Sequence, residues 1–228
     1  DKGILKFENF LPADKVEPLL SEIKKVPPSS LDNDENLVFN LRKTNPAIND
    51  FFLNSGILKI IQDCIGRSET EIERFYNIDM FAQRIFSYYK NDDEQKVAHI
   101  DTFFPTLKWW YFPEAVEFNQ GTFCYDKAPR QTEKLYQWLY DTSIKVCTGD
   151  FEDWRGDGHR NGAFRINKEE RDYLGIELEQ IVVKPNTLVI ANTGNFHSRG
   201  EVSHPHLRNA IFGSARISKP FTLSRYAY

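Results

Sequence analysis

From about residue 72 onward, the chain is a series of short segments rich in aromatic and β-branched residues, and this pattern constrains the fold most. Turns that contain Asp, Asn, Gly or Pro separate the segments, as is typical of β-strands. The segments are MFAQRIFSYYKND, TLKWWYFPEAVEF, GTFCYDK, QIVVKPNTLVIANT and RNAIFGSARIS. Short strands at this spacing predict a mainly β fold, either a sandwich or a jelly-roll barrel.

The preceding part of the chain has the apolar spacing of amphipathic helices. One helix is predicted over about 13–25, with Asp14 as its cap, and a second ends at Gly66. The apolar positions that carry the pattern are Val16, Leu19, Leu20, Ile23, Phe51, Phe52, Ile57, Ile60 and Ile61. Residues 1–70 are therefore predicted to be mostly helical and to pack outside the β barrel.

The chain of 228 residues is within the range of a single β domain, and no linker or repeat divides it. We predict one domain over 1–228, with the barrel at 72–221. The stretch 151–175 is charged and rich in glycine, so we expect an insertion there over the barrel mouth.

Composition excludes several classes of partner. The net charge is −4 and no Lys/Arg cluster is present, so we expect neither nucleic acid nor an anionic membrane as a partner. No apolar run approaches the ~18 residues of a membrane span, and the N-terminus lacks a signal-peptide pattern. Three cysteines without a CxxC pair favour a reducing compartment, and we predict a cytoplasmic protein. The first residue, Asp1, is compatible with a trimmed N-terminus.

The segment VAHIDTFF places a histidine and an aspartate two residues apart in an apolar strand. Residues i and i+2 of a strand share one face, so His99 and Asp101 converge. An imidazole and a carboxylate at one point form two thirds of the 2-His-1-carboxylate triad that binds Fe(II). The pair alone also suits a buried polar contact without metal, so a distant second histidine is required.

The segment NTLVIANTGNFHSRGEVSHPHLRNAIFG supplies three further histidines. His197 follows a strand and a Gly turn, whereas His204 and His206 flank a proline in an expected loop, so His197 is the better ligand. Arg208 lies eleven residues beyond it, in an apolar strand that we expect to run antiparallel to the strand of His197. A buried arginine needs an anion, and a dicarboxylate cosubstrate offers one.

With these residues the chain resembles the phytanoyl-CoA dioxygenase-like Fe(II)/2-oxoglutarate oxygenases, in particular bacterial members of unassigned substrate. The family pattern of HxD, an aromatic strand, a distal His and an Arg eleven residues later matches HID, KWWYF, FHSRG and LRNAIFG. The likeness spans about residues 6 to 221. It places His99, Asp101 and His197 on the metal ligands and Arg208 on the residue that holds the distal carboxylate of 2-oxoglutarate.

The resemblance implies a double-stranded β-helix, the cupin-like jelly roll. It also implies an enzyme that uses Fe(II), 2-oxoglutarate and O2 to hydroxylate a small organic molecule, with formation of succinate and CO2. Halogenating relatives have a small residue at the carboxylate position, so Asp101 favours hydroxylation.

Three further residues are candidates for cosubstrate binding. Trp110 matches a family tryptophan near 2-oxoglutarate, and Lys108 shares its strand face and needs an anion if it is buried. The resemblance places an amide near Gln83 for a hydrogen bond to the cosubstrate. Core packing is the alternative for Trp110, and an ordinary polar position on a strand is the alternative for Gln83.

The chain departs from the family pattern in one turn and at one further position. Arg130 and Gln131 replace the histidine end of a family turn, and Arg199 stands where some relatives have a small hydroxyl residue. Arg130, Arg199, Arg155 and His159 favour an anionic or polyhydroxylated small-molecule substrate, although each also suits a solvated surface.

Two other functions remain open from the sequence. One is a cupin-like metalloprotein, such as an isomerase, that uses the same ligands with another metal. The other is a jelly-roll binding module without catalysis, in which His99 and His197 are core polar groups. Fe(II)-dependent succinate formation distinguishes all three functions.

Overall fold

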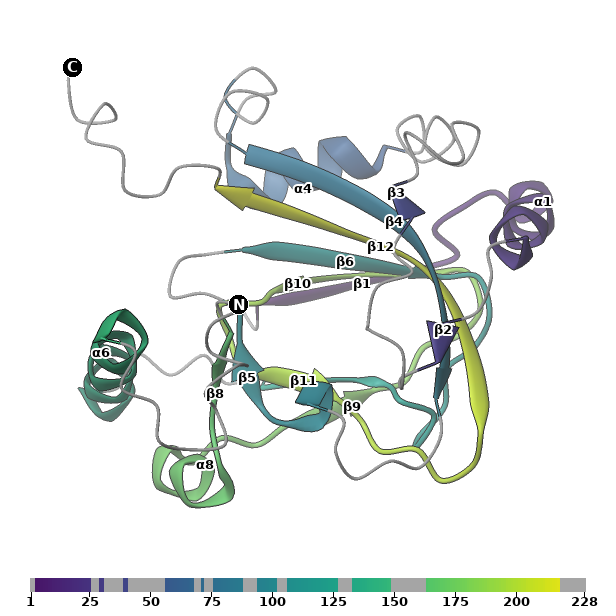
Figure 1. Ribbon diagram of the computed structural model, residues 1–228. Helices are drawn as coiled ribbons and strands as arrows, with labels where there is room; N and C mark the ends of the chain where they lie inside the picture. Colours follow the sequence, from purple (N-terminus) through teal and green to yellow (C-terminus); the bar gives the residue numbers. More distant parts are fainter. Residues whose placement is uncertain are drawn as a thin grey trace.

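The computed structural model describes residues 3–25, 29–30, 39–40, 56–67, 71, 76–87, 94–101, 106–126, 133–148 and 163–217. Two β-sheets face each other, and helices lie outside them (Figure 1). The fold is therefore mainly β with flanking helices, and the predicted jelly roll is confirmed.

The larger sheet has seven strands. Its order is β1-β10-β6-β12-β4-β2, and β3 also pairs with β4. The strands are β1 (Ile4–Glu8), β2 (Ser29–Ser30), β3 (Phe39–Asn40), β4 (Tyr76–Ser87), β6 (Leu107–Phe112), β10 (Thr187–Asn192) and β12 (His206–Ile217). All neighbours are antiparallel except β2 and β4. Strand β6 lies inside the sheet, between β10 and β12.

The smaller sheet has five strands in the order β8-β5-β11-β7-β9. They are β5 (His99–Ile100), β7 (Phe123–Tyr125), β8 (Phe164–Arg165), β9 (Glu179–Ile181) and β11 (His197–Arg199), and all pair antiparallel. A short 3-10 helix, η1 (Glu94–Lys96), precedes β5. This sheet carries both predicted histidine ligands.

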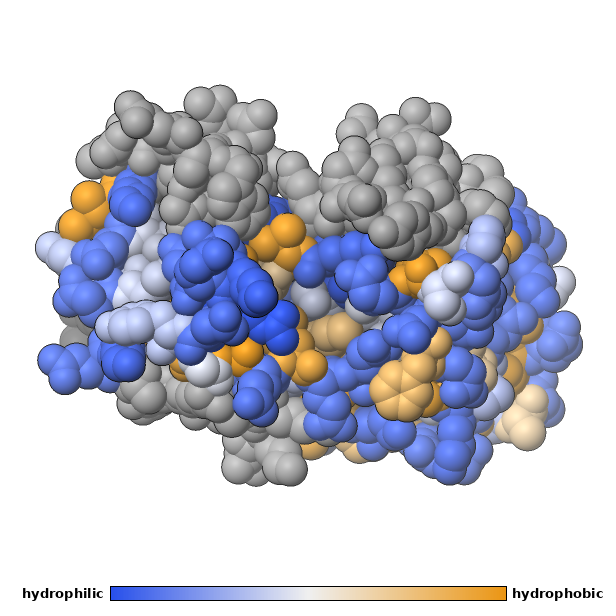
Figure 2. All heavy atoms as spheres, turned by 90° about the horizontal axis from the view of Figure 1, so that it is seen from below, coloured by the Kyte–Doolittle hydropathy of each residue, from blue (hydrophilic) through white to orange (hydrophobic). Residues whose placement is uncertain are grey.

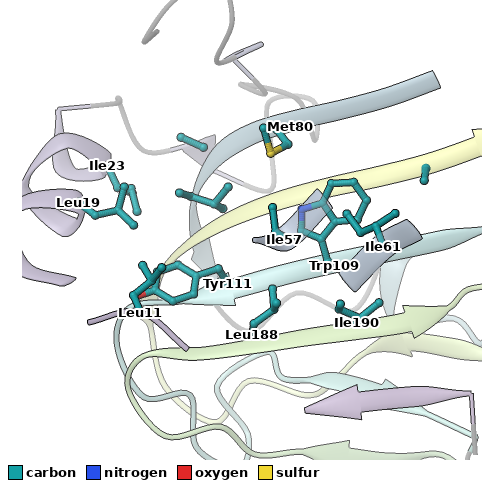
Figure 3. Close-up of a cluster of buried hydrophobic side chains, with 13 residues drawn as sticks. Leu11, Leu19, Ile23, Ile57, Ile61, Met80, Trp109, Tyr111, Leu188 and Ile190 are labelled. Atoms are coloured by element: carbon teal, nitrogen blue, oxygen red, sulfur yellow. The ribbon is translucent and has the colours of Figure 1, made fainter. Parts of the chain in front are cut away.

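Two helices cover the outer face of the larger sheet. Helix α1 (Ala13–Lys24) and helix α4 (Ile57–Ile65) pack their apolar sides onto the fully buried Trp109 and Tyr111 of β6 (Figure 3). The first helix predicted to lie outside the barrel is thus confirmed, and the second is confirmed from Ile57 to its end at Gly66. Phe51 and Phe52, which also carried the predicted pattern, lie outside the described residues. Residue Pro12, and not Asp14, is the N-cap of α1, and Asp14 lies in the first turn.

A second core fills the space between the sheets. It contains Phe112, Val189 and Ala210 from the larger sheet and Phe123 and Tyr125 from the smaller one, with Trp110 packed against it. The alternation predicted for β6 is therefore correct, because its even-numbered residues face the other sheet and Trp109 and Tyr111 face the helices.

Some elements were not assigned from the sequence. Strand β1 adds an edge to the larger sheet, although we expected the first 70 residues to be mostly helical. Helix α6 (Glu133–Thr148) lies between β7 and β8, and its Trp138 packs in a third cluster. Leu135, Trp138 and Leu139 have the i, i+3, i+4 spacing that indicates an amphipathic helix in this segment.

Helix α8 (Lys168–Leu174) lies near the end of the stretch predicted to be an insertion. Asn167 and Glu170 form a capping box at its start, and Gly175 ends it with positive φ. Residues 151–162 of the insertion lie outside the described part.

Hydrophilic side chains predominate on the face of the molecule that is seen from below (Figure 2). Among the helices of the described ranges, none has the length and apolar character needed to cross a bilayer.

A substitution at Gly213 of β12 tests the packing around Trp109. It lies opposite Trp109, and a Cβ at this position would be 2.2 Å from the indole. We expect Gly213→Ala to lower the free energy of unfolding by about 1–3 kcal/mol, because it overpacks a filled core. Urea unfolding measures the change.

The matched control is the double variant with Trp109→Phe, whose smaller ring leaves room for the methyl group. The double variant should lose less stability than the sum of the losses of the two single variants, because Trp109→Phe removes the clash that Gly213→Ala creates. Simple additivity would show that Gly213 is not needed for the close approach to Trp109.

Candidate metal centre

The two predicted histidine ligands lie side by side in the smaller sheet. His99 begins β5 and His197 begins β11, and they are direct partners in the antiparallel ladder. Their ring centroids are 4.4 Å apart. Two residues almost a hundred positions apart in sequence thus share one face of the sheet.

Both imidazoles are held by the same type of hydrogen bond. The Nδ1 of His99 lies 2.7 Å from the carbonyl oxygen of Val97, and the Nδ1 of His197 lies 2.9 Å from that of Asn195. A carbonyl accepts but does not donate, so each Nδ1 carries the proton. Each Nε2 is then left with a lone pair, as in metal-binding histidines.

Asp101 completes the cluster. Its Oδ1 is 3.8 Å from Nε2 of His197, and ligand atoms of Asp101, His99 and His197 all lie within 4.8 Å of one another. Donor atoms on one divalent ion are about 3–4 Å apart, because each bond is about 2.1 Å long. Small side-chain rotations therefore suffice for all three to share an ion.

Burial adjusts the charges of the three side chains, which are at most 7% exposed. Burial lowers the pKa of both imidazoles below the usual value, so they are neutral at neutral pH. Burial alone would raise the pKa of Asp101, but the ammonium of Lys108 outweighs it and lowers this pKa. The cluster is thus two neutral imidazoles and one carboxylate, which suits Fe(II).

Lys108 contacts this carboxylate directly. Its Nζ is 2.9 Å from Oδ1 and 2.8 Å from Oδ2 of Asp101. A buried lysine at this position was expected to require an anion. In the structure, that anion is the candidate metal ligand itself.

Aromatic rings extend from the cluster across the space between the sheets. The ring of Phe123 is 5.7 Å from that of His197 and 4.5 Å from that of Trp110. Trp110 in turn lies 5.7 Å from Phe212. Trp110 therefore lies inside the barrel, and Phe123 lies between its ring and that of His197.

Arg208 forms a second contact between the two sheets, away from the metal cluster. It is buried, it belongs to β12 in the larger sheet, and its Nη1 donates to the carbonyl oxygen of Gly121, just before β7. The expectation that its strand pairs with that of His197 is wrong, because β12 pairs with β4 and β6. The guanidinium reaches the smaller sheet by crossing the gap between the sheets.

The competing residues lie elsewhere. His204 is exposed and its ring lies near that of His206, which is the first residue of β12 and not a loop residue as expected. Arg216 lies near the far end of β12, and its side chain is outside the described part.

Strand register places two further candidates on the inner faces. Gln83 is opposite Ala210, a member of the core between the sheets, and Arg199 is opposite Phe123. Arg199 is also two residues from His197 and shares its face. Arg130, Arg155 and His159 lie outside the described residues.

Asn195 supports the site but was missed by the sequence analysis. Its carbonyl holds the ring of His197, and its Nδ2 donates to the hydroxyl of Tyr125 at 2.9 Å. Tyr125 is the partner of His197 on β7, and the one proton of its hydroxyl lies between two acceptors, the backbone carbonyls of Gly3 and Asn192 at 2.9 and 3.0 Å. The sequence offers one indication of this role: Asn195 lies two residues before His197, as Val97 lies two residues before His99, and both carbonyls accept from the following histidine.

A scan of protein-family models and a search of curated proteins found no match to this chain. Solved structures of similar fold include HygX from Streptomyces hygroscopicus with nickel and 2-oxoglutarate bound. HygX is 12% identical, the alignment covers 95% of this chain and 82% of HygX, and the TM-score is 0.56.

Two other similar structures come from enzymes of nogalamycin biosynthesis. The epimerase SnoN, in complex with Fe3+, alpha ketoglutarate and nogalamycin RO, is 12% identical over 95% of this chain and 80% of its own, with a TM-score of 0.56. The carbocyclase SnoK is 12% identical over 93% and 79%, with a TM-score of 0.55. At these identities the comparisons establish that the chain shares the fold of iron- and 2-oxoglutarate-dependent enzymes.

Proposed function

We propose that the protein is a non-haem Fe(II)/2-oxoglutarate-dependent dioxygenase of the phytanoyl-CoA dioxygenase-like type. The observation that carries the proposal is the buried cluster of His99, Asp101 and His197, with ligand atoms within 4.8 Å, inside a barrel of the matching fold. Arg208, a buried cation that crosses between the sheets, supports it.

The three side chains fit a ferrous ion. They would supply two neutral nitrogens and one carboxylate oxygen, the donor set with which proteins hold Fe(II) for reactions with dioxygen. When bound, the iron and 2-oxoglutarate supply an oxidising chemistry that consumes O2 and releases succinate and CO2.

The chain's own residues hold and orient the reactants. The backbone carbonyls that accept from the two Nδ1 groups keep the imidazole rings in place. Arg208 would hold the distal carboxylate of 2-oxoglutarate by charge-assisted hydrogen bonds. Trp110, Gln83 and Lys108 line the same inner face and contact the cosubstrate, and the aromatic rings exclude water.

Hydroxylation is the proposed outcome because Asp101 stands at the position where halogenating relatives have a small residue in place of the carboxylate. SnoN is an epimerase and SnoK a carbocyclase, so the fold also serves reactions other than hydroxylation. Analysis of the product distinguishes these outcomes.

The proposed substrate is a small anionic or polyhydroxylated molecule. Arg199 shares the face of His197, and Arg130 is proposed to contribute a second cation. We expect such metabolites to increase Fe(II)-dependent succinate release above the uncoupled rate. Stimulation by neutral lipophilic compounds only would contradict this substrate class.

The first test of the site is metal binding. Replacing His99, Asp101 or His197 with alanine should abolish stoichiometric Fe(II) binding under nitrogen, because two ligands do not hold the ion. His204→Ala is the matched control and should bind one equivalent. If His204→Ala loses the iron and His197→Ala keeps it, the assignment of the distal ligand is wrong.

The second test is cosubstrate affinity. Arg208→Ala should weaken 2-oxoglutarate binding roughly a hundredfold, because a charge-assisted contact in a buried site is lost. Iron binding should be unchanged. The affinity is measured with Fe(II) present and oxygen excluded, and Arg216→Ala on the same strand is the control. A loss only in the Arg216 variant would locate the carboxylate anchor there instead.

A further inference from the structure

Lys108 extends from the middle of the larger sheet to the proposed metal ligand Asp101. Strand β6 lies inside the sheet, and its Lys108 is flanked by Ala191 of β10 and Ser214 of β12. The side chain is only 16% exposed, and its Nζ lies 5.7 Å from the centre of the Phe212 ring. The backbone is thus fixed on both sides, and the ammonium is directed across the gap to Asp101.

The ammonium contacts both oxygens of the carboxylate, at 2.9 and 2.8 Å. One of these oxygens, Oδ1, is also the one that lies 3.8 Å from Nε2 of His197. An ion bound by the cluster would be coordinated by this same carboxylate. Lys108 and a metal ion are therefore competitors for the same group.

The charges of the cluster make this competition unfavourable for the metal. Asp101 is the only anion of the three candidate ligands, and Lys108 already neutralises it. A divalent ion at the cluster would lie within a few ångströms of the ammonium, in a buried place where charges are poorly screened.

Lys108 also has a favourable effect, because it holds the carboxylate in one orientation. Fixing a short side chain with two rotatable bonds changes an affinity by only a few-fold. The repulsion between an ammonium and a dication at such a distance is larger, so the charge effect decides the sign.

We propose that Lys108 lowers the affinity of the cluster for a divalent metal ion as long as no anionic cosubstrate is bound. This rests on the proposed function, because it requires that the cluster binds metal. A dianion such as 2-oxoglutarate restores the charge balance, so metal and cosubstrate bind cooperatively. Lys108 is thus a positioning residue that favours the complete complex over the site with metal alone.

The experiment is the binding of cobalt(II) to the whole chain, without 2-oxoglutarate, by calorimetry and by the visible spectrum of the bound ion. Lys108→Met removes the charge, and Lys108→Gln removes the charge but keeps a hydrogen-bond donor for Asp101. A buffer of about pH 8 keeps the carboxylate ionised. Both variants should bind cobalt at least tenfold more tightly than the wild type.

Lys96→Met is the matched control. The side chain of Lys96 is similarly buried, at 11% exposed, but it pairs at 2.9 Å with the exposed Glu201 and not with the cluster carboxylate. Its cobalt affinity should remain within about twofold of the wild type. Circular dichroism shows whether each variant is folded, and the glutamine variant serves if the methionine variant is not.

A second measurement tests the cooperativity. Saturating 2-oxoglutarate should tighten cobalt binding by a larger factor in the wild type than in Lys108→Gln. Equal or weaker cobalt binding by both variants without 2-oxoglutarate would overturn the inference and leave the proposed function intact. If the wild type and all variants are folded but bind no cobalt, the proposed metal centre itself is wrong.

Discussion

The site depends on the alternation of side chains along β6. Trp109 and Tyr111 face α1 and α4, whereas Lys108 and Trp110 face the smaller sheet. Because the period of a strand is two, a slip of one residue would exchange these faces. Gly213 opposes this slip, since the indole of Trp109 occupies the space where a Cβ would otherwise lie. The packing of the outer core thus also determines which groups enter the space between the sheets.

The smaller sheet contributes the other half of the site through strands of only two or three residues. His99 and His197 are direct partners there, and each ring is oriented by a backbone carbonyl of its own chain segment. Asn195 connects the segment of His197 to Tyr125, which is in turn bonded to the backbone near the N-terminus. Short strands therefore suffice because side-chain hydrogen bonds restrict them further.

Electrostatics connects the two sheets. A buried carboxylate without a partner is costly, and Asp101 obtains its partner, Lys108, from the opposite sheet. Arg208 crosses the same gap in the same direction and bonds to the backbone beside β7. The contacts of Lys108 and Arg208 with the smaller sheet therefore depend on the observed separation of the two sheets. An anionic ligand between the sheets would interact with the same two cations.

The sequence by itself determined the class of fold, the outer position of α1 and α4, the two faces of β6 and the candidate ligands His99, Asp101 and His197. These follow from local periodicity and from residue types whose chemistry is specific. It did not reveal β1 as a strand, the pairing of β12 with β4 and β6, or the role of Asn195. Tertiary structure also decided that the anion beside Lys108 is Asp101. Contacts between sheets depend on the packing of distant strands, and a pattern within one segment carries no information on the segment that it will face.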